Sequence, residues 1–376
     1  MREEFIDQTP VLMVKYGRAK VDGSSVKSME QTLPQASQNE APTDARATRA
    51  SRMFPGSPDL SALASTDGRL WRDVRRTLDA RYSRIWMDIA GRYLCMFSLL
   101  AISCGIAAGW GNGVGLLLAP VWAVGMGFWF ATIVLFMHEA AHYNLASDKA
   151  RNDRLANGLV CLLIGDDIRH YRALHWKHHL KLGEVDDSEV SYHYAPDLRF
   201  ALETLCGVHA WRVFQNHRAR GVGNTSEEGQ VRDRFALVRG LSFHAMILGF
   251  LIVSGFWSSA VAWVLAVGVV FPYLSALRQQ LEHRSLDAGS REDFARKPHG
   301  AINRMFARTV GARAFGSAGF WRHLLHHWDP TVSYTRYDDL EDFLMGTPLA
   351  EEIDEARTSY LTVWRGLVRQ GVSEGG

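Results

Sequence analysis

Two long stretches of the chain contain no charged residue, and they dominate its hydrophobic pattern. Asp, Glu, Lys and Arg are absent from 93–137 and again from 241–277. Because a membrane-spanning helix needs roughly 20 consecutive apolar residues, each stretch can hold two spans. The first stretch is interrupted by Gly109-Trp-Gly-Asn-Gly113, and the second can turn between Ser254 and Ser259. The pattern predicts two transmembrane helical hairpins, with spans at about 93–109, 114–137, 241–256 and 258–277.

Basic residues flank both stretches, whereas neither predicted hairpin tip carries a charge. The flanking basic residues are Arg69, Arg72, Arg75, Arg76, Arg81, Arg84, Arg92, Lys149, Arg151, Arg154, Arg232, Arg234, Arg239, Arg278, Arg284, Arg291 and Arg296. Basic residues beside a span stay on the cytoplasmic side, so all four flanks are expected there. We therefore expect an integral protein of the bacterial inner membrane whose helical cap faces the cytoplasm.

The segments outside the predicted spans differ in composition. Residues 1–68 are mostly polar and lack the apolar stretch of a signal peptide, which predicts a flexible tail. Residues 70–92 are typical of a basic amphipathic helix that lies on the membrane surface. The membrane domain then covers 69–345, and 346–376 forms a C-terminal helical segment. Strand patterns are sparse, so the expected fold is mostly α.

Bulk composition narrows the function classes only slightly. The 376 residues carry a net charge of +2, so no general attraction to nucleic acid is implied. The four cysteines form no C-x-x-C pair. We interpret them as small buried hydrophobic residues rather than as disulfides or thiolate ligands.

Eight of the fifteen histidines fall into three clusters. The clusters read His138-Glu-Ala-Ala-His142, His175-Trp-Lys-His178-His179 and His323-Leu-Leu-His326-His327. Residues three or four apart share one helix face, and a neutral imidazole is the commonest metal ligand. The arginine pattern places all three clusters on the same side of the membrane. Eight imidazoles exceed the ligands of one ion, so the sequence predicts a shared site for two metal ions.

The first cluster alone leaves three interpretations open. His-Glu-x-x-His is also the zinc-protease signature, with Glu139 as general base. Glu139-x-x-His142 is also half of the carboxylate di-iron motif, whose second Glu-x-x-His the chain lacks. The segment can also be a helix that merely carries two histidines. A zinc protease uses three protein ligands and leaves the two later clusters unexplained, whereas imidazoles accept several first-row metals.

The clusters and their surroundings resemble the membrane-bound fatty-acid desaturase and hydroxylase superfamily. Its boxes run H-x(3,4)-H, H-x(2,3)-H-H and (H/Q)-x(2,3)-H-H, and boxes and hairpins match over 93–334. The run His326-His327-Trp-Asp-Pro330-Thr-Val332-Ser-Tyr334 is similar to the H-H-x-x-P-x-(I/V)-x-Y of acyl desaturases. Gly183-Glu-Val-Asp186-Asp187 stands in place of the family's acidic stretch, although its usual asparagine and Asp-Pro-Asp are missing.

The resemblance implies a set of site residues. Family members use a further histidine where the fourth span emerges, and His283 stands there. Gln279 is similar in place to an asparagine that reaches the metal through water in some members. Acidic side chains that could orient the imidazoles are Asp186, Asp187, Glu139 and Glu282. The implied ligands of two iron ions (Fe2+) are His138, His142, His175, His178, His179, His283, His323, His326 and His327, and no other catalytic residue is expected.

The resemblance also implies an activity, namely O2-dependent desaturation of an acyl-lipid or similarly apolar chain. Some relatives act on an amino-acid-derived natural product of the dihydrorhizobitoxine type. The alternatives are a hydroxylase on the same scaffold, a membrane zinc protease, and a metal-binding transport or sensor protein without chemistry. The chain lacks the His-Pro-Gly-Gly of a fused cytochrome b5 domain, so a separate electron donor of the ferredoxin or cytochrome b5 type is expected. The other histidines are expected not to be ligands: His170, His193, His209, His217, His244 and His299.

Overall fold

The computed structural model describes residues 54–219, 234–289 and 299–373. Most of these residues are helical, which confirms the predicted fold class at that level. A small parallel pair of strands joins β1 (Met305–Phe306) to β2 (Arg357–Thr358). Residues 1–53 of the predicted tail lie outside the described residues.

The helical elements follow in chain order. They are η1 (Leu60–Ala62), α2 (Trp71–Arg75), α3 (Tyr82–Val134), α4 (Phe136–Ala141), α5 (Lys149–Leu155), the π-helix η2 (Ala156–Val160), η3 (Cys161–Leu163), α6 (Ile168–Lys181), η4 (Ser191–His193), α7 (Leu198–Leu205), α8 (Val208–Ala219), α9 (Arg234–Val253), α10 (Trp257–Leu265), the π-helix η5 (Ala266–Val270), α11 (Phe271–His283), α13 (Val310–Phe315), α14 (His323–Trp328), η6 (Tyr334–Arg336), α15 (Tyr337–Leu344), α16 (Ala350–Glu355) and α17 (Tyr360–Ser373).

The long element α3 consists of two helices that meet at Gly111. The backbone there has φ 83° and ψ 160°, a conformation that only glycine adopts readily. A Cβ atom built on Gly125 would lie 2.9 Å from Leu99 Cδ1, so residues far apart in α3 are in contact. The chain therefore reverses direction at Gly111, and the two halves of α3 pack against each other.

A second pair of helices packs against α3. α9 ends at a turn that contains Gly255, and α10 then continues through η5 into α11. The two turns are joined by Asn112, whose Nδ2 donates to the Gly255 carbonyl (2.8 Å) and whose Oδ1 accepts from the Ser258 amide (3.1 Å). Gly127 allows the helices to approach closely, because a Cβ there would lie 2.6 Å from Val270 Cβ.

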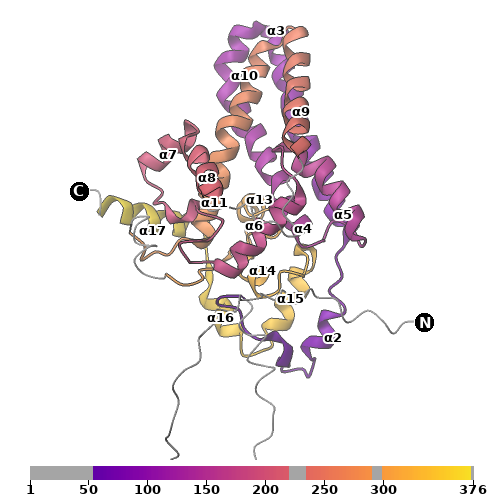
Figure 1. Cartoon of the computed structure of the whole chain (residues 1–376), viewed down its shortest axis with the longest axis vertical. Helices are drawn as coiled ribbons and strands as arrows, with labels where there is room; N and C mark the ends of the chain where they lie inside the picture. The colour runs from indigo at the N-terminus through magenta and orange to yellow at the C-terminus, as the bar shows by residue number, and fades with distance from the viewer. Residues whose placement is uncertain (1–53, 220–233, 290–298, 374–376) are drawn as a thin grey trace, which may run out of the picture. The chain divides into compact units, whose positions relative to one another are not determined.

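Three helices among the described residues are long and apolar enough to cross a membrane: Tyr82–Ala141, Phe235–Val253 and Trp257–His283. α3, α9 and α10 run side by side (Figure 1). Large apolar side chains project outward from these helices, among them Leu117 (78% exposed), Phe250 (68%) and Val253 (89%). Such an outward apolar surface suits a hydrocarbon surrounding better than water.

The predicted helix over 70–92 is interrupted in the structure. α2 ends at Arg75, and α3 begins only at Tyr82. Between them, backbone groups bond outside any helix: the Asp79 carbonyl accepts from Arg336 Nε (2.7 Å), and the Arg81 amide donates to Thr335 Oγ1 (3.1 Å). Leu78 is buried there in a core cluster with Trp71, Tyr337 and Leu60. The segment 54–68 adjoins this cluster: Leu60 is buried, and Ser57 Oγ donates to the His327 carbonyl (2.8 Å).

The C-terminal residues of the chain pack onto the C-terminal end of α11. Val363 and Leu367 of α17 are buried in a cluster with Leu281 of α11 and Phe306 of β1. α14 and α15 both contribute to the cluster that buries Leu78, and the residues from α14 are Leu324, Leu325 and Trp328. Ile168 of α6 lies in a further cluster with Ile85 and Ile89 of α3 and Phe136 of α4, so α6 packs where α3 begins and where α4 follows its end.

Candidate metal centre

All nine histidines named from the sequence lie together in two buried groups. We call the first the five-histidine group: His138, His142, His175, His179 and His326. We call the second the four-histidine group: His178, His283, His323 and His327. Within each group the candidate ligand atoms all lie within 4.8 Å of one another. Segments distant in sequence therefore converge on one centre.

The geometry of a helix explains why the chain repeats H-x-x-H-H. His175 and His179 of α6 are one turn apart, and both belong to the five-histidine group. His178 belongs to the four-histidine group, because successive helix residues are rotated by about 100°. α14 reverses the assignment, with His323 and His327 in the four-histidine group and His326 in the other. Each helix therefore serves both groups.

The ring nitrogens approach each other as ligands of one ion do. His179 Nε2 lies 3.0 Å from His175 Nε2 and 2.8 Å from His326 Nε2. His323 Nε2 lies 3.0 Å from His283 Nε2 and 3.2 Å from His327 Nε2. Two imidazole nitrogens at about 2.1 Å from an ion, roughly at right angles, lie about 3 Å apart.

Some of these nitrogens have no hydrogen-bond partner in the described part of the chain. They include both ring nitrogens of His138 and of His142, and Nε2 of His178. Buried polar atoms are normally satisfied, so a set of unsatisfied nitrogens that face one another fits metal ligation. Both groups have the donor set and the spacing that a metal ion needs.

Outer hydrogen bonds fix the rings of the four-histidine group. His178 Nδ1 donates to Asp187 Oδ2 at 2.9 Å, which leaves Nε2 directed at the group. Tyr192 Oη also donates to this carboxylate, at 2.7 Å. His283 Nδ1 donates to the Ile302 carbonyl at 2.9 Å. Such acceptors set the tautomer and the orientation of a ligating histidine.

Burial keeps most of the imidazoles in the neutral form that binds metal. Loss of hydration, aided by neighbouring imidazoles, lowers the pKa of His179 and His326 well below the usual value. His178 differs. Burial acts to lower its pKa, but the carboxylates of Asp187 and Glu189 outweigh that effect and raise the pKa to about 9. The Asp187 and Glu189 carboxylates thus favour a second proton on His178, and a metal ion at Nε2 would have to displace that proton.

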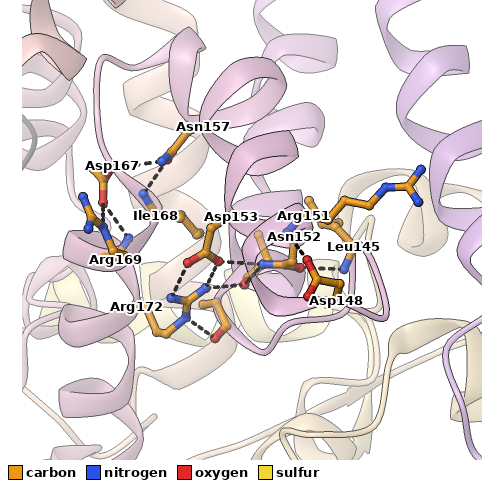
Figure 2. Close-up of polar contacts among 12 residues, drawn as sticks. Leu145, Asp148, Arg151, Asn152, Asp153, Asn157, Asp167, Ile168, Arg169 and Arg172 are labelled. Carbon is orange, nitrogen blue, oxygen red and sulfur yellow. Dashed lines mark hydrogen bonds and ion pairs between the residues drawn. The ribbon is translucent and has the colours of Figure 1, made fainter. Parts of the chain in front are cut away.

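A buried polar network positions the first two histidine clusters relative to each other (Figure 2). Arg172 of α6 donates to the carbonyls of Ala141 (2.9 Å) and Ala140 (3.1 Å), directly before His142. Its guanidinium also pairs with Asp153 of α5. Asn152 Nδ2 donates to the Ala140 carbonyl at 2.9 Å. The end of α4 is therefore fastened to α5 and α6.

Sequence reasoning missed two positioning residues in this centre. Arg172 stands three residues before His175, but its spacing gave no sign that it reaches the backbone of α4. Glu189 Oε1 lies 3.5 Å from His175 Nδ1. The acidic run after the second cluster was recognised only as far as Asp187, and Glu189 continues it two residues later.

The predicted acidic and amide residues are placed differently from one another. Asp187 is buried against His178, whereas the Asp186 side chain is 49% exposed and lies 3.9 Å from Lys181 Nζ. Glu139 is buried and accepts from Ser333 Oγ at 2.8 Å. Glu282 pairs with Arg278 at 2.7 Å. Gln279 Oε1 is buried and has no hydrogen-bond partner within the described residues.

His170, His193, His209, His244 and His299 lie outside both groups, and the side chain of His217 lies outside the described part of the structure. His170 Nδ1 lies 2.9 Å from Asp166 Oδ1, and His209 Nε2 lies 3.2 Å from Ser191 Oγ. His244 donates from Nε2 to the Leu163 carbonyl and accepts at Nδ1 from Trp263 Nε1. Because an indole N–H can only donate, Nδ1 of His244 is the acceptor, and both of its ring nitrogens have partners within the protein.

Comparison with known proteins agrees with the centre. No curated protein gives a significant match. The family model described as Fatty acid desaturase matches residues 114–353, more than half of the chain. The matched range includes every histidine of both groups. The chain therefore belongs to the fatty acid desaturase family.

Proposed function

We propose that the protein is an O2-dependent, two-iron desaturase that introduces a double bond into an acyl-lipid or similarly apolar chain. The observation that carries the proposal is the pair of buried histidine groups, which lie where the long apolar helices Tyr82–Ala141 and Trp257–His283 end. Imidazole ligands suit iron as well as zinc and copper, and family membership favours iron. When bound, the two irons supply the activation of O2 that removes hydrogen from an unactivated C–H bond.

The residues of the chain contribute orientation and exclusion of water. Asp187 and the Ile302 carbonyl hold His178 and His283 with their Nε2 atoms toward the four-histidine group. Every histidine in both groups is buried, so bulk water does not reach the candidate ligand atoms directly. We propose Gln279 as a further, water-bridged ligand of the four-histidine group, since its buried Oε1 has no hydrogen-bond partner in the described residues.

The proposed membrane topology has four spans, with the metal centre on the cytoplasmic face of the bacterial inner membrane. The reversal at Gly111 supports two spans within α3, and α9 with α10–α11 supplies the other two. The basic residues that flank the two charge-free stretches support a cytoplasmic position for the histidine-bearing ends of the spans. Residues 69–345 are proposed as the membrane domain, between a polar N-terminal tail and the C-terminal helical segment 346–376.

A small, mostly apolar hollow between α3, α11 and α13 is the proposed point of approach for an apolar substrate. Its lining includes Phe128, Leu135, Leu274, Phe315 and Arg278. The Arg278 guanidinium stacks on Phe320 at 4.0 Å, and the Phe320 ring lies 4.4 Å from His138. A narrower proposal is an amino-acid-derived substrate of the dihydrorhizobitoxine type. Arg278 in the lining of the hollow is already paired with Glu282 (2.7 Å), so a substrate carboxylate would have to share its guanidinium.

Metal analysis and metabolite comparison test the proposal together. The purified protein should contain about two irons, and cells with the gene should accumulate a metabolite lighter by two hydrogens. Gain of one oxygen would instead identify a hydroxylase on the same scaffold. One zinc and peptide cleavage would support the protease centred on His138, Glu139 and His142. Metal without O2 consumption, when reductant, a ferredoxin or cytochrome b5 donor and substrate are supplied, would leave a transport or sensor role.

Two histidine variants test the site itself. His178→Ala and His326→Ala each remove one candidate ligand, from the four- and five-histidine groups respectively. Both should lose iron and activity while the protein still inserts into the membrane. The matched control is His170→Ala, which removes a half-buried histidine bound to Asp166 and should keep iron and activity. Full activity in either ligand variant would overturn the site.

A further inference from the structure

α7 and α8 form a helical pair beside α11 that the histidine chemistry does not explain (Figure 1). α7 is apolar on two sides. Phe200 and Thr204 are buried against the protein. On the opposite side Leu198 (75% exposed), Leu202 (54%) and Leu205 (40%) recur at the spacing of one helix face. Val208, at the start of α8, continues this exposed stripe.

The depth of α7 follows from its contacts with the proposed fourth span. α7 packs against α11 and also against η5 (Ala266–Val270). The charge-free stretch ends at Leu277, seven residues after Val270. At 1.5 Å per helical residue, Val270 lies about 10 Å inside that boundary. A helix that reaches η5 therefore reaches the level of the hydrocarbon.

The charged side chains of α7 and α8 are paired with one another, as is usual for charges near hydrocarbon. Glu203 Oε1 lies 2.9 Å from Arg199 Nε and 2.9 Å from Arg212 Nη2. The acidic side chain is only 18% exposed, between two cations. Ionisable groups inside a membrane pair with one another, and long arginine side chains extend toward the head groups. The exposed leucine stripe carries no charge of its own.

We propose that α7 and the start of α8 form a re-entrant helical pair embedded in the cytoplasmic leaflet, with Leu198, Leu202, Leu205 and Val208 in contact with lipid acyl chains. This inference rests on the proposed membrane topology. The partner of the stripe is the bilayer, because α7 packs on η5 at the level of the hydrocarbon and an outward-facing stripe at that level meets acyl chains. A soluble electron donor would need a stripe that faces water.

Spin-label accessibility tests the proposal in the full chain. The four native cysteines are replaced by serine, and single cysteines are introduced as Leu202→Cys, Phe250→Cys and Asp354→Cys. Each labelled protein is reconstituted into vesicles of phosphatidylethanolamine and phosphatidylglycerol, after iron content has confirmed its fold. The Leu202, Phe250 and Asp354 side chains are all more than half exposed, so the label replaces no core contact.

The label at position 202 should relax more strongly with O2, which concentrates in hydrocarbon, than with a water-soluble nickel chelate. Position 250, near the end of α9 and within the proposed third span, should behave in the same way, and position 354 should show the reverse order. If the label at position 202 relaxes more strongly with the nickel chelate, as at position 354, while the label at position 250 relaxes more strongly with O2, the re-entrant pair is wrong and the proposed spans stand. If 202 and 250 both favour the nickel chelate, the membrane topology itself is wrong.

Discussion

The Asp187 carboxylate accepts a hydrogen bond from His178 Nδ1 at 2.9 Å, and both side chains are almost fully buried. This contact decides which nitrogen of His178 faces the four-histidine group. The same carboxylate accepts from Tyr192 Oη, so its own position is fixed. One buried acid thus links the loop after α6 to the proposed metal ligands.

Asp187→Asn should weaken metal binding. An amide keeps an oxygen acceptor but removes the negative charge that makes His178 a better ligand. Loss of such an outer partner typically reduces metal affinity or activity about 10- to 100-fold. Iron content after dialysis against a weak chelator measures the change. The control is the neighbour Asp186→Asn, whose side chain is 49% exposed, and which should leave iron content unaltered. Equal losses in the two variants would count against a specific role for Asp187.

Gln279→Leu should reduce iron occupancy below two per chain. The substitution keeps the side-chain size but removes the buried Oε1 that lacks a hydrogen-bond partner among the described residues. The four-histidine group has one imidazole fewer than its neighbour, so it depends more on an additional ligand. Gln279→Asn keeps an amide and should retain more iron than Gln279→Leu. Full iron content and turnover in Gln279→Leu would exclude this residue from the centre.

Ser333→Ala should destabilise the protein while iron content stays at two. Ser333 Oγ donates to Glu139 Oε2 at 2.8 Å, and both side chains are buried. Removal of the donor leaves a buried carboxylate short of one partner, at a cost of about 1–3 kcal/mol. Thermal unfolding in detergent measures the loss. Ser61→Ala removes an exposed hydroxyl bonded to Asp59 and should not shift the transition. An unchanged Tm in Ser333→Ala would show that Glu139 does not depend on this contact.

Gly127→Ala should separate α3 from η5. A Cβ atom at this position would lie 2.6 Å from Val270 Cβ and 2.9 Å from the Ala266 carbonyl oxygen. Relief of such overpacking typically costs about 1–3 kcal/mol. The control is Gly249→Ala in α9, where a Cβ meets nothing within 4 Å. There alanine should raise stability slightly through its helix propensity. The Tm of each variant in detergent measures the change in stability. A Gly127→Ala variant with the same Tm as Gly249→Ala would contradict the close packing of α3 on η5.

The elements that repeat with helical spacing were predictable from the sequence. The i and i+4 histidines of α6 and α14 were recognised as single faces, and the structure places each such pair in one group. The charge-free stretches likewise predicted long apolar helices, and three such helices are present among the described residues. Shared helix faces and long apolar helices depend on the spacing of residues close in sequence, so they can be predicted without the tertiary structure.

Contacts between distant segments were not predictable in the same way. Nothing in the spacing of Arg172 indicates that its guanidinium reaches the carbonyls of α4. The expected helix over 70–92 is interrupted where the Asp79 carbonyl and the Arg81 amide bond to Arg336 and Thr335 instead of within a helix. Helix geometry separates His178 from His179, but the histidines that each of them meets come from α4, α11 and α14. Each of these results depends on tertiary packing, which overrides local pattern.

Asn112 has a consequence for how the two helix turns are held together without charge. Its side chain joins the turn at Gly111 to the turn at Gly255, because the amide donates to the Gly255 carbonyl and accepts from the Ser258 amide. A charged side chain near hydrocarbon needs an ionic partner, whereas a carboxamide satisfies two backbone groups and carries no charge. A single neutral side chain thus ties together the two turns between the apolar helices.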